Sequence, residues 1–275
     1  MRTDSPLARA VFAPALQSLY AWVRQIPLLG EFSHKLARRV LPAGARINTR
    51  VRKGQGVGLC LYLDPRYEAQ YAAGLHETAL LESLAAHLRQ GDVFYDVGAH
   101  IGFISLVSAR LVGPKGRVFA FEADPENASR ILAHAQMNSL PQIELVRAAV
   151  WSECKALSFH RAPGFSSRNT GAVVHGTENK SADGIIEVEA VTLDRFALDH
   201  RLPVMVKIDV EGAEEMVLKG AEMVFRESKA KLICEIHNAR AADGVANWLE
   251  VLGYRWNWLD KEHEFPRHLV GQANS

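Results

Sequence analysis

Residues 93–102 read Val-Phe-Tyr-Asp-Val-Gly-Ala-His-Ile-Gly, and they give the clearest indication of the fold class. An apolar run of strand length ends at Gly98, and helical spacing begins after Gly102. A glycine permits the tight turn that a strand-to-helix junction needs. In an open α/β sheet, ligands bind at such junctions, outside the carboxyl ends of the strands. The stretch therefore predicts a ligand-binding turn or, as the plainer alternative, a tight turn that binds nothing.

Outward from this stretch, apolar runs alternate with helical segments. The predicted strands are 93–97, 117–121, 143–150, 204–208, 232–236 and 254–259. The predicted helices are 77–88, 102–111, 125–138, 213–225 and 241–252. This alternation predicts an α/β fold with a doubly wound, mainly parallel sheet that helices cover on both faces.

One interval interrupts the alternation. Residues 156–160 and 185–192 have the pattern of paired strands, which predicts a β-hairpin insertion. The polar residues 161–184 lie between them, and loops of this length are usually functional or disordered. We expect this loop to shape a ligand pocket with Arg168, Asn169 and His175, and a disordered insertion is the alternative.

The composition is that of a globular protein. Of 275 residues, 48% are hydrophobic and 23% are charged, which excludes a disordered or collagen-like chain. The net charge of +1 argues against a protein that wraps duplex nucleic acid. Three cysteines without metal-type spacing favour a reducing compartment. No apolar run reaches about 18 residues and no signal peptide is evident, so we expect a cytoplasmic protein.

The first 53 residues differ from the rest in charge. They hold ten basic and two acidic side chains, a net charge of +8. We therefore divide the chain into a basic, helical N-terminal extension (1–53) and a main domain (54–275). Phe12, Tyr20 and Trp22 lie on or near one apolar face, so the extension could contact a membrane surface peripherally. The alternative is a helical lid that packs on the main domain.

Glu122 follows the predicted strand 117–121. An acid about 20–25 residues beyond the first glycine of such a turn, at the tip of the adjacent strand, can accept both hydroxyls of a ribose. The alternative is an acid that favours the N-terminus of the next helix, where Asp124 and Glu126 also lie. With the glycine turn in place, the ribose interpretation is favoured.

A further acidic stretch, Val-Lys-Ile-Asp-Val-Glu-Gly-Ala-Glu, occupies residues 206–214. Buried acids are unfavourable without a partner, so acids at a strand tip indicate a site. Interaction with a helix dipole explains Glu214 and Glu215 well, but Asp209 lies too early for it.

Together these stretches resemble a known family. The pieces are Asp96–Gly102, Phe121-Glu122-Ala123, Thr192-Leu193-Asp194, Lys207–Glu214 and Glu235-Ile236-His237. They look like the FkbM-type methyltransferases, class I enzymes that use S-adenosylmethionine and mostly O-methylate hydroxyls of sugars, glycolipids or polyketides. The resemblance covers roughly residues 56–259. His100 is a departure, since the family more often has asparagine there.

The resemblance implies roles for particular residues. The methionine part of S-adenosylmethionine would be surrounded by Asp96, Gly98, Ala99, His100 and Gly102. Glu122 would hold the ribose, and Asp209 would lie beside the transferring methyl group. The expected acceptor is a small-molecule or glycolipid hydroxyl.

An alcohol is a poor nucleophile while protonated, so a base near the acceptor oxygen is useful. Our preferred base is His237, whose ordinary pKa of about 6.5 leaves it mostly neutral at pH 7, with Asp209 orienting the acceptor. A divalent cation held by Asp209, Glu211, Glu235 and His237 is the alternative, and we rank it lower.

Two other classes of protein stay open. An NAD-dependent oxidoreductase would share the sheet and Glu122, but Ile101-Gly102-Phe103 does not supply the third glycine of a dinucleotide turn. A binding module that has lost catalysis would tolerate loss of acids at the strand tips. Asp96, Glu122 and Asp209 are all present, which favours an active enzyme.

Overall fold

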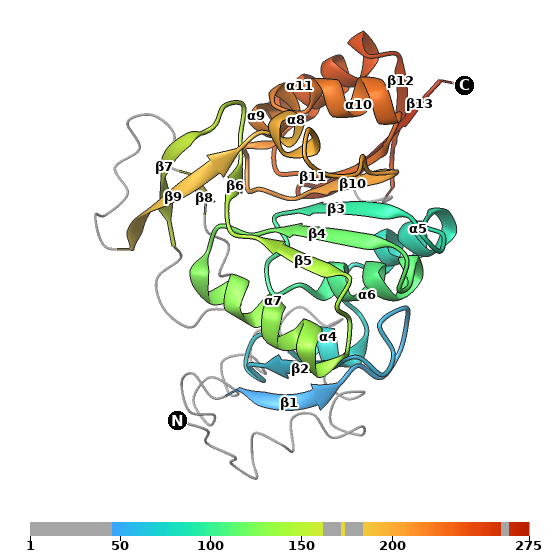
Figure 1. Cartoon of the computed structure of the whole chain (residues 1–275), viewed down its shortest axis with the longest axis vertical. Coiled ribbons are helices and arrows are strands. Elements are labelled where there is room, and N and C mark those ends of the chain that lie inside the picture. Colours follow the sequence, from blue (N-terminus) through green and yellow to red (C-terminus); the bar gives the residue numbers. More distant parts are fainter. Residues whose placement is uncertain (1–45, 162–171, 174–183, 260–263, 275) are drawn as a thin grey trace.

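The computed structural model describes residues 46–161, 172–173, 184–259 and 264–274, and a seven-stranded sheet lies at its centre (Figure 1). The spatial order is β12-β13-β11-β10-β3-β4-β5. The bounds are β3 (Val93–Val97), β4 (Arg117–Phe121), β5 (Ile143–Val146), β10 (Met205–Ile208), β11 (Lys231–Ile236), β12 (Tyr254–Trp258) and β13 (Arg267–Ala273). Neighbouring strands pair in parallel along the part of this order that comprises β5, β4, β3, β10 and β11. Strand β13 is antiparallel to both of its neighbours. The predicted doubly wound, mainly parallel sheet is confirmed.

The chain reverses its direction of travel across the sheet between β3 and β10. It runs outward from β3 through β4 to β5, and later returns to place β10 on the other side of β3. The carboxyl ends of β3 and β10 therefore lie side by side, with Val97 opposite Ile208. Such a switch point leaves a crevice at the strand ends, where ligands bind.

Alternation along the strands divides the core into two layers. On β3, Phe94 contributes to one layer, whereas Val93, Tyr95 and Val97 contribute to the other, as the two-residue period of a strand requires. The first layer receives helices α5 (Thr78–His87), α6 (Phe103–Val112) and α7 (Pro125–Met137). The second receives α8 (Leu193–Ala197), α9 (Glu214–Lys219), α10 (Glu222–Ser228) and α11 (Ala239–Val251). Figure 1 shows these two groups on opposite sides of the sheet.

Two smaller sheets flank the central one. Strands β7 (Lys155–His160) and β9 (Ile185–Val191) pair antiparallel, which confirms the predicted hairpin insertion, and they form a sheet with β6 (Ala149–Val150) and β8 (Ala172–Val173). The loop residues Arg168, Asn169 and His175 lie outside the described residues, as do the helices expected before residue 46. Strand β1 (Ile47–Arg50) pairs with β2 (Cys60–Leu63), and Ile47 joins the first core layer.

Two predicted elements were wrong in extent, and other elements were not predicted. The predicted strand 143–150 is two strands, β5 and β6, in different sheets. The predicted helix 213–225 is interrupted between α9 and α10 at Gly220, where a Cβ atom would lie 2.2 Å from the carbonyl oxygen of Trp151. Strand β13, which inserts between β12 and β11, was not predicted. The short helix α4 (Ala69–Ala73) was also missed.

Candidate active site

A cavity of about 460 Å³ opens at the carboxyl ends of the central strands. The predicted site residues that line it are Gly98, Ala99, His100, Glu122 and Asp209. Glu211 and Glu235 line it as well, whereas Asp96, Gly102 and His237 are not part of the lining. The structure thus brings the glycine turn, the ribose candidate and the acids after β10 to one cavity.

The glycine turn between β3 and α6 depends on close backbone packing. Gly98 has a φ of +73°, and a Cβ atom there would lie 1.8 Å from the carbonyl oxygen of Asp209. The backbone N–H groups of Gly98 and Ala99 both donate to the carbonyl oxygen of Phe121, at 3.1 and 3.0 Å. Because residue 98 has no side chain, the end of β10 lies directly against the turn.

His100 occupies the turn in a left-handed conformation, with a φ of +51°. The hydroxyl group of Tyr71 lies 3.3 Å from its Nδ1 atom. Burial lowers the pKa of His100 to about 4, so the ring is neutral near pH 7. The Nε2 atom is buried without a hydrogen-bond partner among the described residues. A buried ring nitrogen without a partner is the kind of atom that a bound ligand satisfies.

Glu122 lies at the end of β4 with 7% of its surface exposed. Its Oε2 atom accepts a hydrogen bond from the backbone N–H of His100 at 2.7 Å, and its Oε1 atom accepts one from the backbone N–H of Asp124 at 2.8 Å. Burial raises the pKa of Glu122 to about 8, although these two donors favour the charged form. The carboxylate keeps further lone pairs for a ligand. With the open backbone at Gly98 and the unpaired nitrogen of His100, these features fit the ribose and methionine parts of S-adenosylmethionine.

Asp96 lies beneath the turn and is fully buried. The hydroxyl group of Ser105 donates to its Oδ2 atom at 2.5 Å, and the ammonium group of Lys207 lies 3.4 Å from Oδ1. Its nearest contacts thus support helix α6 and Lys207. Direct contact between Asp96 and the cofactor stays a prediction, as it does for Gly102, the residue before α6.

Lys207 belongs to one of the stretches that carry the family resemblance but was given no role from the sequence, and the structure gives it a central position. It is 3% exposed, and its ammonium group donates to the carbonyl oxygen of Gly98 at 2.8 Å. The same group lies 3.4 Å from Asp96 and 3.4 Å from Asp209. Burial alone would lower the pKa of Lys207, but the charges of Asp209 and Asp96 outweigh it and raise the pKa. Lys207 therefore remains a cation and joins the glycine turn to the end of β10.

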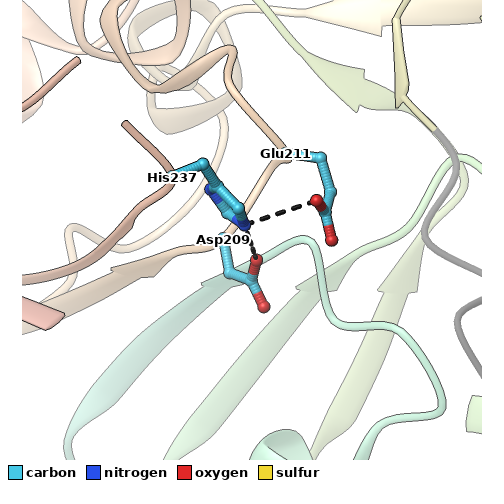
Figure 2. Close-up of side chains that lie close together, drawn as sticks. All are labelled: Asp209, Glu211 and His237. Atoms are coloured by element: carbon cyan, nitrogen blue, oxygen red, sulfur yellow. Dashed lines mark ion pairs between the residues drawn. The ribbon is translucent and has the colours of Figure 1, made fainter. Parts of the chain in front are cut away.

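The ends of β10 and β11 carry a group of ionisable side chains that we call the charge cluster: Asp209, Glu211, Glu214, Glu235 and His237. The Nε2 atom of His237 lies 3.4 Å from Glu211, and 3.9 Å from both Asp209 and Glu235. Figure 2 shows that Asp209, Glu211 and His237 point toward one another. The Nδ1 atom of His237 lies 2.6 Å from the Oε1 atom of Glu214.

The charge cluster has unusual protonation. Burial raises the pKa of Glu235 to about 9, and the charge of Asp209 adds to this effect. Burial also acts to raise the pKa of Asp209, but Lys207 and a hydrogen bond with Glu235 outweigh it and lower the pKa. For His237, burial lowers the pKa, yet Glu214, Glu211 and Asp209 outweigh it and raise the pKa to about 9. This differs from the ordinary value that was assumed for His237 from the sequence.

Helix α4 and the start of α5 form a cavity wall that the sequence did not indicate. The rings of Tyr71 and His76 have centroids 4.1 Å apart, and Phe103 lies 5.2 Å from Tyr71. Glu77 stands beside them with a φ of +47°, and His76 lies 2.8 Å from one of its oxygens. These residues have no motif spacing, so only the fold could have placed them at the site.

Comparison with known proteins adds the family. The model of the methyltransferase FkbM domain matches residues 96–256, which is more than half of the chain. The chain belongs to the FkbM methyltransferase family. Membership confirms the predicted family, a family of S-adenosylmethionine-dependent methyltransferases with a Rossmann-like fold.

Individual relatives share only part of their length with this FkbM-family chain. The hexuronic acid methyltransferase AglP of Haloferax volcanii is 29% identical over 163 residues, which are 58% of this chain and 62% of that protein. The solved FkbM methyltransferase of Methylobacillus flagellatus KT is 16% identical, with a TM-score of 0.48 over 74% of this chain and 65% of that one. A precorrin-6y C5,15-methyltransferase of Geobacter metallireducens is 15% identical, with a TM-score of 0.47 over 73% of this chain and 90% of that one.

Within the described residues, no helix is both long and apolar enough to cross a membrane.

Proposed function

We propose that this protein transfers a methyl group from S-adenosylmethionine to a hydroxyl oxygen of a sugar. The observation that carries the proposal is that the glycine turn, Glu122 and Asp209 all line one cavity. A relative that acts on a hexuronic acid supports a sugar acceptor over a glycolipid or polyketide.

The cofactor half of the site comprises the turn and the end of β4. We assign the methionine part of S-adenosylmethionine to Asp96, Gly98, Ala99, His100 and Gly102. Glu122 accepts hydrogen bonds from the two ribose hydroxyls. When bound, the cofactor supplies a methyl group on a positively charged sulfur.

The acceptor half of the site comprises the charge cluster. Lys207 holds Asp209 in its ionised form at the cavity edge, where this carboxylate accepts a hydrogen bond from the acceptor hydroxyl and orients its oxygen. His237 is fixed behind Asp209 by Glu214. We assign the handling of the acceptor hydroxyl to the pair Asp209 and His237.

The test begins with the cofactor. Calorimetry with S-adenosylmethionine and with NAD should show binding of the first alone, and binding of NAD alone would support the oxidoreductase alternative. A methyl-release assay over glucuronic acid, neutral sugars, glycolipids and polyketide alcohols then identifies the acceptor. D209N and H237A should keep cofactor affinity and lower turnover by about 10²-fold, because both changes disturb the orientation of the acceptor oxygen. Normal turnover in both variants would overturn the assignment of this pair.

The basic residues 1–53 support a second, separate proposal, that of peripheral contact with an anionic membrane. The test is flotation with vesicles that contain anionic lipid. A version that starts near Arg50 should bind less than the full chain, and equal binding would refute the idea.

A further inference from the structure

The charge cluster has the composition of a metal site. Asp209, Glu211 and His237 each offer one ligand atom, and these three atoms lie within 4.8 Å of one another. Figure 2 shows them converging from the ends of β10 and β11. We propose that these three side chains bind one divalent cation of the Mg²⁺ or Mn²⁺ class at the edge of the cavity.

The distances suit octahedral coordination. Ligands about 2.1 Å from a metal lie about 3.0 Å apart when adjacent and about 4.2 Å apart when opposite. The Nε2 atom of His237 lies 3.4 Å from Glu211 and 3.9 Å from Asp209, which is between these limits. An ion therefore fits between the three atoms with small side-chain movements.

Glu214 gives independent support. It is fully buried, its Oε1 atom contacts Nδ1 of His237, and its Oε2 atom has no hydrogen-bond partner among the described residues. A histidine that binds a metal usually donates its other ring N–H to such a carboxylate, which fixes its tautomer. This arrangement directs the Nε2 atom of His237 toward Asp209 and Glu211, and a bound ion would displace the proton that Nε2 otherwise carries.

The ligand set selects the type of ion. Two carboxylates and one imidazole, with further positions open to water, suit a hard divalent cation better than a structural zinc, which is closed by four protein ligands. Both acids line the cavity, so the open positions face the place assigned to the acceptor. A hydroxyl oxygen could occupy one of them, which would make His237 a ligand in place of a base. That catalytic role rests on the proposed function, whereas binding of the ion does not.

The experiment measures Mn²⁺ binding directly. Protein treated with EDTA and then freed of the chelator is titrated with Mn²⁺, and the free ion is followed by electron paramagnetic resonance, with and without S-adenosylhomocysteine. We expect one ion per chain. D209N, E211Q and H237A should each weaken binding at least 10-fold, and E214Q should weaken it about 10–100-fold. The matched control is E215Q, which changes the next acid of α9, one that faces Gly244 instead of the cavity.

Thermal unfolding of each variant checks that it is folded. Glu211 is about one-third exposed, so E211Q remains informative if D209N does not fold. Absence of binding to the wild type at 1 mM Mn²⁺ in both conditions overturns the proposal. Equal weakening by E215Q and E211Q also overturns it. Binding of S-adenosylmethionine in the presence of EDTA is measured separately, so that a failed metal site and a failed methyltransferase assignment give different results.

Discussion

Replacing Glu122 with glutamine should remove a pH dependence from cofactor binding. Burial raises the pKa of Glu122 to about 8, so near pH 7 about one chain in ten carries the ionised form. The ribose hydroxyls are hydrogen-bond donors, and a carboxylate accepts from both, whereas a protonated carboxyl has less capacity to accept. Binding should therefore favour the ionised form of Glu122.

The magnitude follows from the population. If Glu122 must lose its proton before the cofactor binds, the free energy of binding is weakened by about 1.36 kcal/mol for each pH unit below the pKa. The dissociation constant of S-adenosylmethionine in wild type should thus fall about 10-fold between pH 7 and pH 9, and then level off. In E122Q, affinity at pH 9 should be weaker by about 10-fold or more, and the component of the slope due to Glu122 should vanish.

Calorimetry at pH 6, 7, 8 and 9 measures the dissociation constant of S-adenosylmethionine. The difference between wild type and E122Q separates the effect of Glu122 from the effects of Glu235 and His237, which the two proteins share. E144Q, a half-exposed acid on β5, is the control. Stability of the unliganded protein gives a second readout. The pKa of Glu122 in the folded state lies above its unfolded value of about 4.5, so the folded state holds the proton more tightly. The resulting contribution to the free energy of unfolding is lost as the pH rises toward 8. Identical pH profiles in wild type and E122Q would refute the reasoning.

Two further predictions concern the packing around the turn. G98A should lower the free energy of unfolding by about 1–3 kcal/mol more than G253A. Both glycines have left-handed backbones, but a methyl group would clash with the Asp209 backbone at Gly98 and would meet open space at Gly253. Urea denaturation measures the two losses, and equal losses would contradict the prediction. K207M should lower the free energy of unfolding by about 3–5 kcal/mol, since it leaves Asp96 and Asp209 without their buried cation. The exposed K219M on α9 should change the same quantity by no more than about 0.5 kcal/mol, and a similar small loss in K207M would show that the ion pairs are not stabilising.

The sheet could be predicted because its signals are local. The predicted bounds of β3 and β4 match the structure, since a buried parallel strand is a short apolar run that ends at a turn. Strand β13 could not be predicted, because Arg267–Ala273 mixes polar and apolar residues. Its place between β11 and β12 depends on pairing with strands elsewhere in the chain.

At the site, the acids at the strand tips could be predicted from the sequence, but the contacts that connect them could not. Glu214 was interpreted as an acid that favours a helix dipole, yet it is fully buried and contacts His237. Lys207 lies within strand β10, and its neighbours along the chain do not indicate that it contacts both Asp96, which lies in β3, and Asp209, which follows β10. The raised pKa of His237 is also a property of the assembled cluster, because its causes come from three acids that follow a different strand.

The position of strand β13 affects how the protein folds during its synthesis on the ribosome. It lies between β11 and β12, although both are synthesised before it. Chains grow at about 5–20 residues per second, so β11 emerges before the strand that pairs with its edge. Until residues 267–273 emerge, the edge of β11 remains unpaired next to Leu232 and Ile233, and an open strand edge is a template for pairing with other chains. The interval between synthesis of β11 and synthesis of β13 is therefore when this protein depends most on protection from aggregation.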